Sequence, residues 1–210
     1  MNLNIIKKVA AFALTGTMIL SLAACGSTKD SKTEDSSSAK AESKQDVKDN
    51  SLGGWEVNNG KLSLEENAEA KAAFEKATEG LTGYEYEPIA LLGTQIVSGR
   101  NYSILARGKA VVPDAEPSYE IITIYEDLEG NAKIPGEKVL VGGEGEKAVG
   151  AFTANDGEYD FSKNAEVKAI FDKAFDGFVG ASYEAVAYLG SQVVAGTNYL
   201  ALFRETPTVP

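Results

Sequence analysis

The chain of 210 residues has no histidine, one cysteine and two methionines. Without histidine, the Ser-His and Cys-His nucleophile pairs and the histidine-containing metal sites are excluded. The single cysteine, Cys25, excludes a disulfide within the chain. Carboxylates are abundant, but a sequence does not separate a catalytic carboxylate pair from a solvated acidic surface. We therefore expect a protein that is not an enzyme and that carries no cofactor or metal.

Basic residues are also scarce, because 20 Lys and Arg stand against 31 Asp and Glu, for a net charge of −11. Residues 1–24 carry two lysines and no acidic residue, so the chain without them has 18 minus 31, or −13. Such a charge disfavours nucleic acid as a partner, and we expect none. The charge is interpreted as that of a soluble secreted domain. The glycine-rich residues 142–145 lack the lysine and helix of a phosphate loop and are interpreted as a linker.

Long hydrophobic runs are confined to residues 9–22, which follow Lys7 and Lys8. This run is too short and too rich in small residues to predict a membrane span with certainty, and it is typical of a secretory signal. Leu22, Ala23, Ala24 and Cys25 then resemble a bacterial lipobox. The resemblance implies cleavage after residue 24 and acylation of Cys25, which would anchor the protein to the lipid bilayer outside the cytoplasm. The alternative is an ordinary secretory signal.

Residues 25–51 contain Ser, Lys, Asp, Glu, Thr and Gln and almost no large apolar residue. Such a segment cannot bury enough surface to offset the entropy lost on ordering. We predict a disordered polar linker between the signal segment and the rest of the chain.

An internal repeat is the main feature of the sequence. A shift of 97 residues aligns residues 53–113 with residues 150–210 without a gap, and 27 of the 61 pairs are identical. A unit of this length is typical of a small domain rather than of a solenoid. We predict a first domain over 52–149 and a second, truncated domain over 150–210, which has no counterpart of residues 114–149. The second should have an unpaired edge at 198–206, with weak independent stability or self-association through that edge.

Within each unit a helix precedes strands. Ser63 with Glu66, and Asp160 in the second unit, are predicted to cap the helices, and Gly80 and Gly177 to end them. Strands are predicted over 84–96, 101–112, 119–126 and 132–141. One helix followed by an antiparallel meander indicates an α+β fold.

The side chains of the second predicted strand alternate. Tyr102, Ile104 and Ala106 should share one face, with Ser103, Leu105 and Arg107 on the other. Arg107 is expected to face solvent or to be paired. Trp55, the only tryptophan, aligns with Phe152 and is expected to pack against the sheet.

Two nearly identical strings remain. Gln95-Ile96-Val97-Ser98-Gly99 is followed by Asn101-Tyr102, and Gln192-Val193-Val194-Ala195-Gly196 by Asn198-Tyr199, while Leu52-Gly53-Gly54 precedes the first helix. With the order of elements, these strings resemble the cystatin family of cysteine peptidase inhibitors. The resemblance implies a cystatin-like fold, one helix wrapped by an antiparallel sheet and duplicated in tandem. It also implies that the glycine trunk and two hairpins form a wedge that plugs the cleft of a papain-like cysteine peptidase.

The resemblance assigns a binding role to residues of both units. They are Gly53, Gly54, Gln95, Ile96, Val97, Ser98, Gly99 and Leu128 in the first, and Gln192, Val193, Val194, Ala195 and Gly196 in the second. The glutamine amide should offer a donor and an acceptor to the partner's backbone. Residues 126–130 form an acidic loop where many cystatins carry Pro-Trp, and Leu128 is its only apolar residue, expected to anchor the loop. The alternative is a binding module on the same scaffold for a surface glycan, a peptide or an envelope protein.

Overall fold

The structure, a computed structural model, describes residues 53–143 and 150–208, which fall in one compact unit. The predicted signal segment, Cys25, the linker over 25–51, Leu52 and the junction over 144–149 lie outside the described residues. No helix of the described part combines the length and the apolar character needed to cross a membrane.

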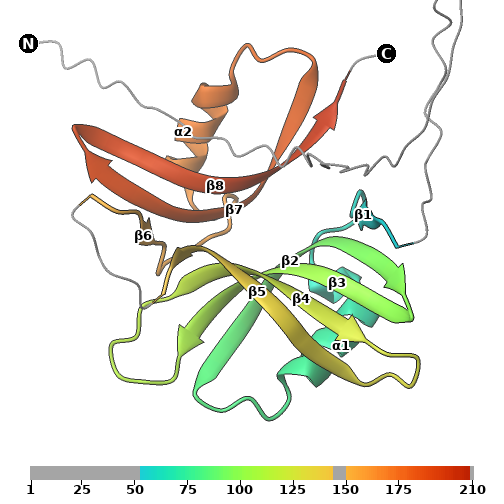
Figure 1. Cartoon of the computed structure of the whole chain (residues 1–210). Coiled ribbons are helices and arrows are strands. Elements are labelled where there is room, and N and C mark those ends of the chain that lie inside the picture. The colour runs from blue at the N-terminus through green and yellow to red at the C-terminus, as the bar shows by residue number, and fades with distance from the viewer. Residues whose placement is uncertain (1–52, 144–149, 209–210) are drawn as a thin grey trace, which may run out of the picture. The chain divides into compact units, whose positions relative to one another are not determined.

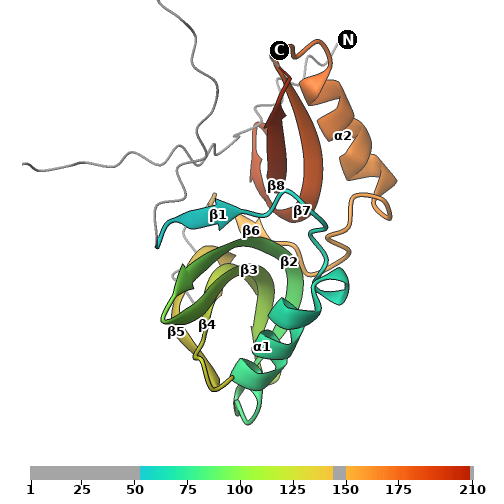
Figure 2. The same cartoon turned by 90° about the vertical axis from the view of Figure 1, so that its right-hand side faces the viewer.

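The first sheet has five antiparallel strands in chain order. They are β1 (Trp55–Val57), β2 (Tyr84–Val97), β3 (Gly99–Ala110), β4 (Ser118–Glu126) and β5 (Ala132–Gly142). A 3-10 turn (Leu64–Glu66) leads into the helix α1 (Ala68–Thr78). The sheet curves around α1, which lies against its concave side (Figures 1 and 2).

The second sheet has three strands in the order β6-β7-β8. They are β6 (Thr153–Ala154), β7 (Ala181–Val194) and β8 (Gly196–Pro207), with the helix α2 (Ala165–Phe175) before β7. Each of α2, β7 and β8 begins and ends 97 residues after α1, β2 and β3, so the offset of the sequence repeat is also the offset of these elements. Helices beside antiparallel sheets make the described fold α+β.

The predicted helix starts are wrong by about one turn, whereas the predicted ends are confirmed. The Ser63 hydroxyl accepts from the Glu65 amide and caps the 3-10 turn, and Asn67 precedes α1. Asp160 likewise accepts from the Ser162 amide, while the Asn164 side chain caps α2. The cap signals were therefore real but belong to the turn before each helix. Gly80 and Gly177 have positive φ just beyond the helix ends, as expected of terminating glycines.

The alternation predicted for β3 is confirmed and explains the core. Tyr102, Ile104 and Ala106 are buried against α1 in a cluster that β4 completes with Ile122 and Ile124. Leu105 points to the opposite face and belongs to a second cluster, which also contains Ala187 and Leu189 of β7. The predicted strands match β2 to β5 within two residues at each end, whereas the short strands β1 and β6 were not predicted.

Arg107 is paired, and the repeat mirrors its contacts. Its guanidinium bonds to Glu87 at 2.5 Å and its Nη1 donates to the Gly157 carbonyl at 3.0 Å. Arg204, 97 residues later, pairs with Glu184 and donates through Nη1 to the Gly60 carbonyl at 2.6 Å. Each arginine thus bonds to the loop of the other repeat at an equivalent glycine, a reciprocity typical of two-fold related interfaces.

Candidate functional site

Three predicted site segments lie at one end of the first sheet, which we call the hairpin end. It comprises residues 53–55, the β2–β3 turn with its flanks (95–99) and the β4–β5 loop (127–131), at the right of the sheet in Figure 1. The strand register fixes this arrangement, because Trp55 pairs with Gln95, Asn101 with Tyr125, and Glu126 with Ala132. Residues up to 78 positions apart in sequence are therefore brought to one edge.

Gln95 connects two of these segments. Its Nε2 donates to the Gly53 carbonyl at 2.7 Å, and its Oε1 accepts from Asn101 Nδ2 at 2.7 Å. Both polar atoms of the amide are thus used inside the chain, which differs from the expectation that they face a partner. The spacing of glutamine and asparagine that the two strings share has a structural reason, since the pair braces the hairpin against the trunk.

Gly99 is required where the hairpin meets β4. Its φ is +119°, and a Cβ there would overlap the Glu126 carbonyl oxygen. The neighbouring Ser98 carbonyl accepts from the Tyr125 hydroxyl at 2.7 Å. The turn is therefore held against the adjacent strand by close backbone approach and by a hydrogen bond.

Apolar side chains are exposed at the hairpin end. Trp55 is 48% exposed, Ile96 61%, Val97 40% and Leu128 85%, whereas Gly54 is half-buried and Ser98 is exposed. The expectation that Trp55 packs against the sheet is wrong, because it lies on the short edge strand β1, all three residues of which are exposed. The expectation that Leu128 anchors its loop is also wrong, because its side chain lies in solvent and polar contacts hold that loop.

Asp127 holds the β4–β5 loop in place of Leu128. Its Oδ1 accepts from the backbone amides of Glu129 and Asn131 at 2.9 and 2.8 Å, and Oδ2 accepts from Asn131 Nδ2 at 2.9 Å. The hydrogen bonds from Asn131 hold the pKa of the Asp127 carboxyl below its usual value. The loop is thus shaped by polar contacts, which leaves Leu128 at its tip in solvent.

The second repeat has the equivalent glutamine–asparagine contacts but only part of the hairpin end. Gln192 Nε2 donates to the Gly150 carbonyl, and Gln192 Oε1 accepts from Asn198 Nδ2 at 2.7 Å. Val193 and Val194 are 75% and 52% exposed, Ala195 is exposed, and Gly196 has φ +146°. Within residues 150–208 no loop stands where 127–131 stands in the first repeat.

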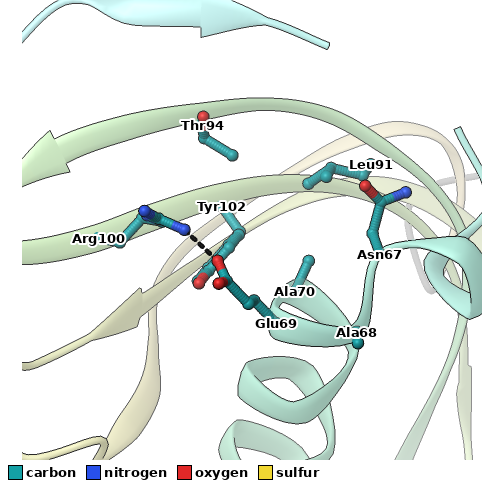
Figure 3. Close-up of a pocket in the computed structure, with 8 residues that line it drawn as sticks. All are labelled: Asn67, Ala68, Glu69, Ala70, Leu91, Thr94, Arg100 and Tyr102. Atoms are coloured by element: carbon teal, nitrogen blue, oxygen red, sulfur yellow. Dashed lines mark hydrogen bonds and ion pairs between the residues drawn. The ribbon is translucent and has the colours of Figure 1, made fainter. Parts of the chain in front are cut away.

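A shallow cavity of about 310 Å³ lies behind the hairpin end, between the start of α1 and strands β2 and β3 (Figure 3). Its lining residues are Asn67, Ala68, Glu69, Ala70, Leu91, Thr94, Arg100 and Tyr102. Arg100 forms an ion pair with Glu69 and lies 6.0 Å from the centre of the Tyr102 ring. These contacts tie the turn end of the hairpin to the helix, so the cavity is part of the support of the edge.

A buried glutamate was missed by the sequence reasoning. Glu120 is 2% exposed and accepts from the hydroxyls of Tyr84, at 2.5 Å, and Ser118. Burial and the bond to Glu120 raise the pKa of Tyr84 to about 12. The alternation of β4 could have revealed this position, because it places Glu120 on the same face as Ile122 and Ile124. Tyr84, Ser118 and Glu120 lie at the end of the sheet opposite the hairpin end.

Across the described ranges, no three His, Cys, Asp or Glu side chains are grouped so that they could hold a metal ion. No family model matches the chain, and neither the curated proteins nor the solved structures contain a match.

Proposed function

We propose that the chain is a surface-tethered, reversible inhibitor of papain-like cysteine peptidases, built on cystatin-like domains. The inhibitory surface is the hairpin end of the first repeat. The observation that carries the proposal is the alignment of three segments, distant in sequence, at one edge with apolar side chains exposed in each.

The geometry supports occlusion of a cleft. The trunk carries Trp55, the first turn Ile96 and Val97, and the second loop Leu128, so each segment offers an apolar tip. Burying apolar surface contributes about 25 cal/mol per Å² before the costs of association are subtracted. An aromatic anchor such as Trp55 commonly carries a large share of the energy of an interface.

The rigidity of the edge supports the same proposal. The Gln95 brace and the contacts of Gly99 and Ser98 with β4 hold the segments before a partner arrives. A preordered edge loses less conformational entropy on docking, so more of the contact energy appears as affinity. Occlusion of a cleft needs no nucleophile. The proposed function therefore requires no catalysis, cofactor or metal.

The second repeat is a weaker candidate. It offers Val193 and Val194 on a braced turn, but the described residues supply no second loop beside it. Fewer contacts converge on one edge there, so the first repeat is proposed as the principal site. Attachment through acylated Cys25, outside the cytoplasm, completes the proposal and rests on the sequence alone.

Titration of papain with residues 26–210 tests the proposal. We expect competitive loss of peptidase activity that recovers on dilution, with the inhibitor left uncleaved. Folding is checked by circular dichroism of the same sample. A folded chain that leaves papain and its close relatives fully active at about 10 μM, a concentration that would detect even modest affinity, would overturn the proposal in favour of a module that binds a glycan, a peptide or an envelope protein.

A further inference from the structure

A second cavity, of about 290 Å³, lies at the end of the first sheet opposite the hairpin end. Tyr84 and Tyr86 of β2 line it, together with Glu120 of β4 and with Glu137 and Val139 of β5. The two tyrosines are two positions apart on one strand, so they project from the same face, and their ring centres lie 4.9 Å apart. The cavity thus combines aromatic rings with carboxylates at a place that the proposed inhibitory surface does not use.

One carboxylate oxygen of Glu120 has no hydrogen-bond donor within residues 53–143 and 150–208. Its Oε1 accepts from the hydroxyls of Tyr84, at 2.5 Å, and of Ser118, which fill the lone pairs of that atom. No residue of those ranges donates to Oε2, although the side chain is only 2% exposed. Among the same residues, every fully enclosed side-chain oxygen or nitrogen has a partner. Oε2 of Glu120 must therefore reach the space of the cavity that this residue lines.

The printed contacts of two cavity carboxylates are with neutral donors. Glu137 accepts from the Tyr86 hydroxyl at 2.8 Å, and in the described part of the chain neither Glu120 nor Glu137 forms an ion pair with a lysine or arginine. Burial and the bonds to these carboxylates raise the pKa values of both tyrosines, that of Tyr84 to about 12, so the hydroxyls stay protonated at neutral pH. Burying a carboxyl group costs free energy unless donors or a cation offset the loss of water. A cationic ligand would supply both an opposite charge and a donor for Glu120 Oε2.

The lining favours an organic cation over a metal ion. Within the described ranges no three acidic side chains are grouped so that they could hold a metal, whereas tyrosine rings attract an ammonium group that lies within about 6 Å of their centres. A primary ammonium has N–H groups that can donate to Glu120 Oε2, which a quaternary ammonium lacks. Val139, 51% exposed, offers an apolar contact to a methylene chain.

The second repeat lacks the equivalent groups. Gly108 lets Tyr84 reach Glu120, because a Cβ at Gly108 would overlap the Tyr84 ring. At the repeat offset of 97 residues, Ala181 stands in place of Tyr84 and Glu205 in place of Gly108. The hairpin can therefore form without the tyrosine–glutamate arrangement, which is specific to the first repeat.

We propose that this cavity binds a primary ammonium group carried on a short methylene chain, either of a free alkylamine or of a lysine side chain. The ammonium donates to Glu120 Oε2 and to the carboxylate of Glu137, which is exposed at the rim. The methylene groups lie against the tyrosine rings and Val139. This binding site does not depend on the inhibitory function.

Proton–nitrogen correlation NMR of residues 26–210 tests the site, with n-butylammonium chloride as the probe and sodium chloride keeping the ionic strength constant. We expect shifts of the amides around the cavity and a Kd of about 1 mM, which is modest affinity. Butan-1-ol has the same chain without the charge and should bind at least about tenfold more weakly. Nα-acetyl-lysine N-methylamide distinguishes the two sources of the ammonium group. Equal or tighter binding than n-butylammonium assigns the cavity to lysine side chains, and weaker binding assigns it to free alkylamines.

Matched variants test the role of the buried carboxylate. Glu120→Gln removes the charge but keeps an acceptor for the two hydroxyls, and it should weaken binding of n-butylammonium at least about tenfold. Glu126→Gln is the control, because Glu126 also lies on β4 and accepts from a tyrosine hydroxyl, that of Tyr102 at 2.9 Å, but stands at the other end of the strand. It should bind n-butylammonium as the unmodified chain does.

A further variant covers the case in which Glu120→Gln fails to fold. Glu137→Gln changes an exposed side chain and should weaken binding by about threefold to tenfold. Affinity that is unchanged in folded Glu120→Gln or in Glu137→Gln would refute the proposal. Butan-1-ol binding as tightly as the amine, calcium chloride producing the same shifts, or an equal loss of affinity in Glu126→Gln would refute it as well.

Discussion

The two sheets contain equivalent hairpins but differ in the strands that lie beside them. The strands β2–β3 and β7–β8 carry the same glutamine-asparagine brace and the same exposed aliphatic turn. In the first sheet β4 and β5 continue the sheet beside the hairpin and add the loop with Leu128, whereas β8 is an edge strand within the described residues. The hairpin motif is therefore a local property, and the three-segment edge depends on the strands that follow it.

The largest difference between the sheets should appear when equivalent leucines are truncated. Leu105 is fully buried and its counterpart Leu202 is half-buried. Leu105→Ala should cost about 2–5 kcal/mol because it leaves a cavity that its surroundings cannot fill. Leu202→Ala should cost less than half of that, because water reaches the site. Urea denaturation of both variants measures the difference, and equal losses would mean that β8 is covered in solution.

A smaller difference is expected at the glycines of the two turns. In Gly99→Ala a non-glycine residue must adopt positive φ, and its Cβ must also displace the Glu126 carbonyl. Destabilisation of about 2–4 kcal/mol should follow. Gly196 also has positive φ, but no strand equivalent to β4 lies beside it in the described part of the chain, so Gly196→Ala should cost about 1–2 kcal/mol. Thermal unfolding compares the two, and a larger loss in Gly196→Ala would contradict the assigned role of β4.

The smallest effect concerns alkaline pH and two hydrogen-bonded tyrosines of the first sheet. Burial and bonds to Glu120 and Glu126 raise the pKa values of Tyr84 and Tyr102 to about 12, against an ordinary tyrosine pKa of about 10. Between these values only the unfolded chain releases the protons, so stability present below pH 10 should fall as the pH rises toward 12. Tyr84→Phe should make this fall shallower, and the second sheet has Ala181 at that position. An unchanged pH dependence of the unfolding midpoint would show that Tyr84 does not titrate in this way.

Sequence patterns sufficed for elements whose signals are local. Alternation around Ile104 identified both faces of β3, and the repeat offset located α2, β7 and β8 from their counterparts. The strand β1 was missed because three residues carry too little periodicity, and its pairing to β2 depends on distant backbone contacts. The exposure of Trp55 follows from that missed strand.

The sequence predicted which residues belong to the candidate site, but it did not predict the contacts that those residues make. The glycine trunk, the first turn and Leu128 came from the resemblance, and the register places them at one end of the sheet. The inward role of Gln95 could not be read from its position, because the Gly53 carbonyl that it binds lies 42 residues away. Buried Glu120 was overlooked because charged residues are seldom fully buried.

The most direct test of the inhibitory account uses the valines of the two turns. Val97→Asp and Val194→Asp change the same residue at equivalent positions, 40% and 52% exposed, so neither should disturb folding. The account predicts that Val97→Asp weakens inhibition of papain at least tenfold, or about 1.4 kcal/mol, because a charge enters the apolar contact of the first edge. Val194→Asp should leave the inhibition constant within about twofold of the unmodified chain. Inhibition that survives Val97→Asp, or that is lost equally in both variants, would contradict the assignment of the first repeat as the inhibitory edge.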